Sequence, residues 1–442
     1  MAPVGLKNAY LFATFNALSF QIVLGSPMIL YAKGLGASAT VLGIIAGMMP
    51  LLVIFQIPAA HYVARVGYKR FVYAGWGTRV MFIFVIALVP ITAGFLDPAT
   101  RVALILMLLF CFNLSRGISS AGWLPWITSL VPASMRGQYL ARDAACVNSA
   151  SFGAMVLAAL CLGMQPRPWQ FTILFLFSAL AGVASLFFLK RIPEGETPER
   201  IRTSNTPVPW REIIGFSPFQ RLVCAAVAWS VGYGGMQAFT VAFLKVVIGM
   251  PEGQILFLNS VAFLGGLCSL WFLGSRLDHL GSKPVLTFSF ATWMLITAGW
   301  MLLAGHALRP GVVLVFALQF LMGLFAALIS MSNTRLLMAV TPLMGRNHFF
   351  ALFSVLANVS LGLAPIVWGV LIDAVGKRQF FSGAFEWNRY TVFFAAVMVV
   401  FVVALALARR LVEPEAATMD RLLREILIAS PQRVWVKLWP RH

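Results

Sequence analysis

The chain alternates long apolar runs with short polar segments, and the length of the runs predicts their structure. A bilayer hydrocarbon core about 30 Å thick needs about 20 apolar residues per helix, whereas a barrel strand needs about 10 of alternating character. Backbone groups in lipid must bond within their own segment, so these runs predict helices. Twelve spans are predicted, near residues 8–31, 39–62, 71–95, 102–130, 143–163, 170–190, 219–247, 253–274, 284–306, 310–337, 348–374 and 390–411.

The composition excludes a soluble fold. The 442 residues are 60% apolar and 11% charged, whereas an ordinary soluble domain is about 45–50% apolar and about 25% charged. A compact soluble domain of this length could not bury so much apolar surface. An all-α integral membrane protein is therefore the expected fold class.

Motifs of enzymes and of cofactor sites are missing from the sequence. It contains no P-loop, no HExxH and no GxSxG motif, and no nucleophile with its base and acid inside the spans, so we expect no enzyme and no cofactor. The cysteines have no CxxC spacing and fall inside predicted spans, which favours packing over metal binding. They are Cys111, Cys146, Cys161, Cys224 and Cys268.

The net charge of +19, from 33 Lys and Arg against 14 Asp and Glu, would suggest a nucleic-acid partner in a soluble protein. Here the basic residues lie in short loops, so no such partner is expected. They include Arg65, Lys69, Arg70 and Arg79, assigned to the loop after the second span. The side that holds both termini carries 24 basic residues and the other side carries eight. This bias predicts cytoplasmic termini.

One long charged interruption, 191–215, separates the sixth span from the seventh. It predicts a linker between two six-helix halves, 1–190 and 216–412. The tail, 413–442, interleaves basic residues with Trp and, if helical, has one apolar face. We expect this tail to bind anionic lipid at the cytoplasmic surface, with a partly disordered tail as the alternative. The protein is expected to be monomeric.

Polar landmarks recur between the halves at fixed offsets, which predicts an internal duplication. At an offset of 210, one window matches at five positions, which hold Pro, Arg, an aromatic residue, Ala and Asn. The matching residues are Pro132, Arg136, Tyr139, Ala141 and Asn148 in the first half and Pro342, Arg346, Phe349, Ala351 and Asn358 in the second. At an offset of 214, the loops after the second and eighth spans match: Val66, Gly67 and Lys69 fall on Leu280, Gly281 and Lys283.

The loop after the eighth span reads G-x-x-x-D-x-x-G-x-K, from Gly274 through Asp278 and Gly281 to Lys283. It resembles the loop signature of the major facilitator superfamily. The first half has basic residues in register but Ala64 at the Asp position. Span count, central linker and motif position extend the resemblance over about residues 1–412.

The resemblance implies two six-helix bundles related by a pseudo-twofold axis along the membrane normal, with a substrate cavity between them and transport by rocking of the bundles. In that family the loop signature is associated with a cytoplasmic latch. The gating residues expected on this basis are Arg65, Gly67, Lys69, Arg70, Gly274, Asp278, Gly281 and Lys283, with Arg136 and Arg346 from the repeated window.

Arg116 is the one basic residue predicted near the middle of a span. A charge there costs several kcal/mol unless it is paired or hydrated, which makes it a functional candidate. Asn113 and Ser120 share its helix face by spacing. The stripe is expected to line the substrate cavity, with an Arg that only stabilises helix packing as the alternative.

Polar stripes also mark other spans, and we predict that they contribute to the same cavity. A helix–helix hydrogen bond of about 1 kcal/mol is the alternative for each of these residues. They are Asn16 in the first span, Trp229, Tyr233 and Gln237 in the seventh, and Gln319, Ser330 and Asn333 in the tenth.

All fourteen acidic residues are assigned to loops, tail or span ends, with Asp373 closest to being embedded. Proton coupling usually needs a carboxylate or His at the depth of the cavity, and none is predicted there. Arg116 favours a small organic anion as the substrate. A sugar or glycoside symporter is the first alternative, supported by the 13% aromatic content, and a drug exporter the next. From another class, a membrane sensor or lipid-handling protein without solute flux stays open.

Overall fold

The computed structural model describes residues 6–131, 136–194, 214–273, 281–340, 346–382, 385–411 and 413. Nearly all of them are helical, which confirms the predicted fold class. One short hairpin joins the last two spans. Its strands are β1 (Phe380–Ser382) and β2 (Phe385–Trp387), which pair antiparallel.

The first half is built from helices that follow the predicted spans. They are α1 (Leu6–Leu24), α2 (Ser26–Gly34), α3 (Ala39–Leu52), α4 (Gln56–Val66), α5 (Tyr68–Leu88), α6 (Pro98–Leu130), α7 (Arg136–Leu162) and α8 (Pro168–Lys190), with 3-10 turns η1 (Val53–Phe55) and η2 (Val89–Gly94). The second half repeats the plan with α10 (Ser217–Tyr233), α11 (Met236–Val246), α12 (Glu252–Leu273), α14 (Ser282–Ala304), α15 (Val312–Val340), α16 (Arg346–Val375) and α17 (Arg389–Arg409).

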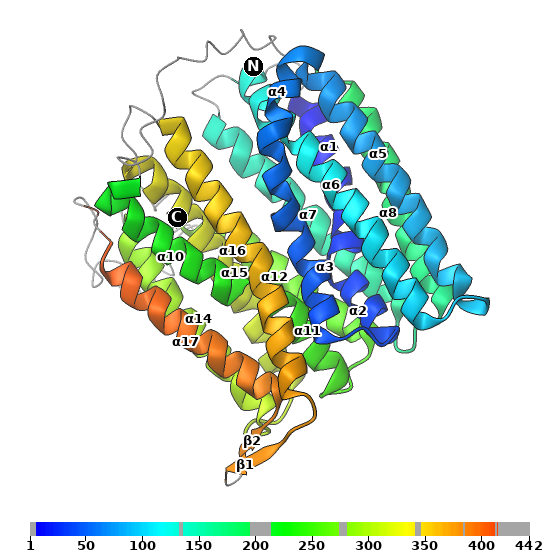
Figure 1. The fold of residues 1–442 in the computed structure, drawn as a ribbon, viewed down its shortest axis with the longest axis vertical. Coiled ribbons are helices and arrows are strands. Elements are labelled where there is room, and N and C mark those ends of the chain that lie inside the picture. Colours follow the sequence, from blue (N-terminus) through cyan, green and yellow to red (C-terminus); the bar gives the residue numbers. More distant parts are fainter. Residues whose placement is uncertain are drawn as a thin grey trace, which may run out of the picture.

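Eleven helical segments within the described ranges are long and apolar enough to cross a membrane. The predicted span that is not among these eleven is the eighth, 253–274, and a helix is present there as α12 (Glu252–Leu273). The helices form two groups that meet along α3 and α16 (Figure 1). We call the end with the β1–β2 hairpin the hairpin end, and the opposite end, where α1 begins, the terminal end.

Side-chain caps fix where several helices begin. Asp97 accepts a hydrogen bond from the backbone N–H of Thr100 at 3.0 Å at the start of α6. The Thr100 hydroxyl and N–H hold the pKa of Asp97 below its ordinary value. Capping satisfies N–H groups that have no partner inside the helix and so fixes its first residue.

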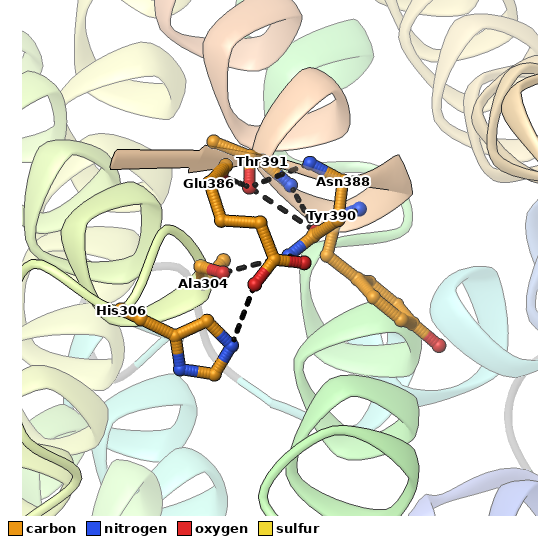
Figure 2. A network of polar contacts seen from close by, with 6 residues as sticks. All are labelled: Ala304, His306, Glu386, Asn388, Tyr390 and Thr391. Carbon is orange, nitrogen blue, oxygen red and sulfur yellow. Dashed lines mark hydrogen bonds and ion pairs between the residues drawn. The ribbon is translucent and has the colours of Figure 1, made fainter. Parts of the chain in front are cut away.

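A second cap anchors the hairpin (Figure 2). Asn388 accepts hydrogen bonds from the N–H groups of Tyr390 and Thr391 at the start of α17 and donates one to the carbonyl oxygen of Ala304 at 2.8 Å. His306 Nε2 lies 3.2 Å from Glu386 Oε2. These contacts bind the β2 strand to the hairpin ends of α14 and α17.

Most buried apolar side chains form one cluster that extends through both halves. A smaller cluster lies in the first half and includes Trp126, Tyr139 and Leu189. Helix faces that pack against each other therefore form the core of each half.

Candidate functional site

Two cavities adjoin between the halves, near the middle of the spans. Their volumes are about 250 and 270 Å³, and both are lined by Tyr233 and Gln237. The first lies against α2, α3, α11 and α16, and the second against α1, α7, α12 and α15. Together we call them the central cavity, because residues from both halves line each part.

Two broken helices border the central cavity. The first span is interrupted at Gly25, between α1 and α2, and the seventh at Gly234 and Gly235, between α10 and α11. Gly235 has φ of +88°, a left-handed conformation that glycine adopts without strain. Gly25 and Gly235 are 210 residues apart, the offset of the repeated window, so the duplication includes the breaks.

The cavity lining is polar but neutral. Gln319 Nε2 donates to Asn259 Oδ1 at 2.7 Å, and Asn259 Nδ2 donates to Ser26 Oγ at 2.9 Å. This chain, which we call the amide chain, links α15 and α12 to α2 in the other half. Gln21 and Asn148 line the second part. Among the described residues that line either part, none is charged.

The seventh and tenth spans contribute part of the predicted set. Tyr233, Gln237 and Gln319 line the central cavity. Trp229 lies one turn from the cavity and stacks on Tyr233, with ring centroids 4.8 Å apart. Ser330 is exposed and Asn333 is buried, and neither lines the cavity.

The predicted stripe on α6 lies away from the central cavity. Asn113 is buried and donates to the carbonyl oxygen of Leu109, while Ser120 bonds the carbonyl oxygen of Gly117. Arg116 is half-buried and has no side-chain partner among the described residues. The expectation that this stripe lines the cavity is not met in this conformation, because α6 packs against α3 and α5.

Arg79 was assigned to a loop, and that assignment is wrong. It lies in α5, eleven residues from the start of that helix, and only 1% of its surface is exposed. One of its terminal nitrogens bonds Asn16 Oδ1, and its guanidinium carbon lies 4.9 Å from the Trp76 ring centroid and 5.4 Å from that of Phe112. The first half thus contains a buried cation held by one amide and two aromatic faces.

Arg79 on α5 and Arg116 on α6 belong to two helices that pack against each other. Neither has a carboxylate partner in the described part of the chain, and Nε of Arg79 is buried without an acceptor. A buried, incompletely satisfied cation is costly and marks a functional candidate in a membrane span. The sequence could have identified Arg79 as a buried cation. At a rise of 1.5 Å per residue, it lies about 16 Å from the beginning of its helix.

Asp143 lies at the beginning of a spanning segment, Arg142–Leu162, in agreement with the prediction that the acids lie in loops, the tail or span ends. It belongs to the second turn of α7, and its Oδ1 is buried without a hydrogen-bond partner among the described residues. The ring of Tyr10, on α1, stacks on Tyr139, one turn before Asp143, at 5.3 Å. A carboxyl group is therefore present inside the terminal end of the first half.

Several of the described contacts between the halves lie at the hairpin end. Asp373, at the end of α16, accepts hydrogen bonds from the N–H groups of Ala39 and Thr40 at 3.0 and 2.7 Å and from the Thr40 hydroxyl at 2.7 Å. The N–H of Gly253 also donates to the carbonyl oxygen of Gly163 at 2.8 Å. We call the Asp373 contacts the outer latch, because they tie α16 to the first turn of α3.

The seam between α3 and α16 is lined by glycine. A Cβ atom on Gly43 would overlap the carbonyl oxygen of Pro365, and one on Gly47 would overlap that of Gly362. Only residues without a side chain allow backbones this close. The hairpin end is therefore closed by direct backbone contact.

At the terminal end, Glu413 caps α14. Its carboxylate accepts from the N–H groups of Ser282 and Lys283 at 3.0 and 2.7 Å and lies 2.6 Å from a terminal nitrogen of Arg335. Gly281, with φ of +81°, precedes the capped turn. Glu413 was not predicted, because nothing in the sequence four residues after the end of α17 at Arg409 marks it as a helix cap.

The other predicted gating residues are only partly described. Gly274 and Asp278, and the side chains of Arg136 and Arg346, lie outside the described part of the structure. Gly67 precedes α5 with φ of +89°, and Lys69 and Arg70 stand in the first turn of that helix. Arg65 is exposed at the end of α4.

Substitution of Glu413 by alanine is expected to destabilise the second half. The change leaves two helix N–H groups without an acceptor and removes an ion pair with Arg335, so we expect a loss of about 1–3 kcal/mol. Chemical unfolding in mixed micelles measures it. Glu194→Ala is the control, because Glu194 Oε1 lies beside Gly67 at the corresponding place but has no hydrogen-bond partner among the described residues. Equal losses in both variants would contradict the capping role.

Comparison with known proteins gives a family and a fold. The family model described as the Major Facilitator Superfamily matches residues 9–315 and 254–440. The fold is similar to that of a D-xylose-proton symporter, at 12% identity over 94% of this chain and 100% of that chain, with a TM-score of 0.72.

Two further solved structures are similar at this level. One is the nucleoside transporter NupG, at 15% identity over 92% of this chain and 98% of that chain, with a TM-score of 0.64. The other is a bacterial homologue of the human lysosomal transporter Spinster in an inward-facing, unoccupied conformation, at 13% identity over 91% and 95%, with a TM-score of 0.65. No curated protein sequence matches.

Proposed function

We propose that this chain, which belongs to the major facilitator superfamily, carries a small, neutral, polar organic solute through the central cavity. Membership in that family makes it a multi-pass membrane transporter and not an enzyme. The observation that carries this proposal is the lining of that cavity. It offers several amide groups, the Tyr233 phenol and no charge among its described residues. A ring-shaped solute with several hydroxyl or amide groups fits this chemistry.

Movement occurs by alternating access, with the two halves rocking around the cavity. The excess of basic residues on the terminal side supports cytoplasmic termini. In that orientation the hairpin end, which is the closed end in this structure, faces the outside of the cell. The predicted latch residues at the terminal end, Asp278 among them, act in the opposite phase of the cycle. The domain boundaries, the lipid-binding tail 413–442 and the monomeric state belong to the same proposal.

The test begins with a thermal-shift screen of purified protein against sugars, nucleosides and organic anions, because a ligand that binds the folded state raises its stability. Hits are then measured by counterflow in proteoliposomes. Substitution of Gln237 by leucine is expected to weaken binding of a neutral hit at least about tenfold, since one buried polar group then loses its partner. Gln254→Leu, on an exposed face of α12, is the control. If only anions stabilise the protein, the neutral-solute proposal fails.

A small organic anion is the second candidate. The observation that favours it is the pair of cations formed by the buried Arg79 and the half-buried Arg116, which have no carboxylate partner among the described residues. In a conformation that opens α6 toward the cavity, Arg116 would reach the substrate. Uptake of an anionic hit should then fall strongly in Arg116→Gln and recover partly in Arg116→Lys. If Arg116→Gln leaves uptake of every anion unchanged, this candidate is excluded.

The non-transporting alternative is tested by the same assay. A sensor or lipid-handling protein of this fold would bind hits in the thermal-shift screen and give no counterflow signal with any of them. The central cavity between two rocking halves favours flux over this alternative.

A further inference from the structure

A groove of about 490 Å³ runs along the outside of the first half, between α5 and α6. Small side chains from both helices line it, among them Ala74 and Thr78 on α5 and Ser119 on α6. We call it the α5–α6 groove. It is separate from the central cavity, with which it shares no described lining residue.

The groove is a fixed feature of the helix pair. The Ser115 hydroxyl donates to the carbonyl oxygen of Gly75 at 2.9 Å, and a Cβ on Gly75 would overlap the side chain of Ser119. These contacts hold the two helices close together at the base of the groove. Its shape therefore does not depend on a flexible loop.

The groove opens away from the protein. Ala74 and Thr78 are exposed, and Ile118 is 38% exposed. Both helices belong to spanning segments, Tyr68–Gly94 and Pro98–Ile127. In a membrane, the groove consequently faces lipid and not water.

The dimensions and charge of the groove match one leaflet. From Arg70 to Phe82, the lining residues of α5 extend over twelve positions, which is about 18 Å of helix and slightly more than half of a hydrocarbon core about 30 Å thick. Arg70 stands at the terminal end, is exposed and has no hydrogen-bond or ion-pair partner among the described residues. It is also the one charged residue among those described as lining the groove.

We propose that the α5–α6 groove binds one anionic phospholipid from the leaflet on the terminal side. An acyl chain lies along the small residues of α5 and α6, and the headgroup phosphate contacts the guanidinium of Arg70. Guanidinium binds phosphate through parallel hydrogen bonds, and basic sites between helices at that surface select anionic headgroups. The lipid would brace α5 against α6, next to the buried Arg79.

Native mass spectrometry of the full-length protein in detergent tests the proposal, with phosphatidylglycerol and phosphatidylcholine as probes. We expect phosphatidylglycerol to bind more tightly, and Arg70→Gln to weaken its binding about fivefold, as for the loss of one cation near anionic lipid. Lys69→Gln is the matched control, because Lys69 is adjacent in sequence but does not line the groove. Equal weakening in both variants would mean general surface attraction and would overturn the proposal.

A second variant tests the acyl-chain part. Ala74→Phe fills the groove and should reduce binding of both lipids, whereas Met81→Phe, on the exposed face of the same helix, should not. Unchanged binding in Ala74→Phe would overturn the proposal. So would displacement of phosphatidylglycerol by equimolar glycerol phosphate, since the headgroup alone would then suffice. Thermal unfolding of each variant in phosphatidylcholine micelles checks that it is folded.

Discussion

Asp373→Ala is expected to open the hairpin end. The variant removes three hydrogen bonds that a carboxylate accepts from the start of α3, and a hydrogen bond to a charged group contributes about 1.5–3 kcal/mol. Loss of even one such contribution shifts the ratio of the conformation with an open hairpin end to the one with a closed hairpin end by at least about tenfold, since 1.4 kcal/mol corresponds to a factor of ten. A cysteine introduced at Ala46, which lines the central cavity, should react faster with an impermeant maleimide added from the hairpin side.

The control is Asp97→Ala. Asp97 also caps a helix, but the capped helix α6 belongs to the same half, so its loss breaks no contact between the halves. The labelling rate at Ala46→Cys should be unchanged in this variant. If Asp97→Ala and Asp373→Ala raise it equally, the effect reflects helix destabilisation and the outer latch has no gating role. If neither changes it, the glycine seam alone closes the hairpin end.

Gly43→Leu is expected to abolish transport while leaving the protein folded. The new side chain would have to occupy space filled by the backbone of α16 at Pro365, so α3 and α16 must separate. Overpacking costs about 1–3 kcal/mol, which disfavours the closed hairpin end by about 5- to 150-fold. Counterflow of any substrate found in the screen measures the loss.

Gly153→Leu serves as the control for the seam. Gly153 is also a helical glycine, on α7, but a Cβ there meets no atom within 4 Å. Transport should stay near that of the unmodified protein. Wild-type flux in Gly43→Leu would show that the seam is not closed tightly during the cycle.

Sequence reasoning predicted the helices and the family, because each rests on a local property. An apolar run of about 20 residues has few stable structures in lipid, and the loop around Gly281 has a recognisable spacing. The prediction for Arg79 is wrong because the residue follows the basic loop residues Lys69 and Arg70 closely in sequence, although it lies eleven residues inside α5. Burial by Trp76 and Phe112 depends on how α5 packs on α6, and a single sequence does not reveal that packing.

The site was predicted only in part for a similar reason. Tyr233 and Gln237 follow a helical stripe toward the cavity, as expected. Asn259 and Ser26 were missed, because each is an isolated polar residue in an apolar context. They become a connected group only when α12 and α2, from different halves, lie side by side. The outer latch depends on a contact between residues more than 330 positions apart, and no pattern along the chain marks it.

The amide chain has a consequence for the energetics of an empty carrier. Gln319, Asn259 and Ser26 hydrogen-bond to one another while the hairpin end is closed. If the cavity closes without a substrate, these polar groups therefore stay paired with one another. The empty protein then has no large desolvation penalty for its polar groups when it changes back to the conformation that opens to the other side. A carrier of this kind can complete a cycle with one direction unloaded. We therefore expect net flux down a gradient without a counter-substrate, in addition to one-for-one exchange.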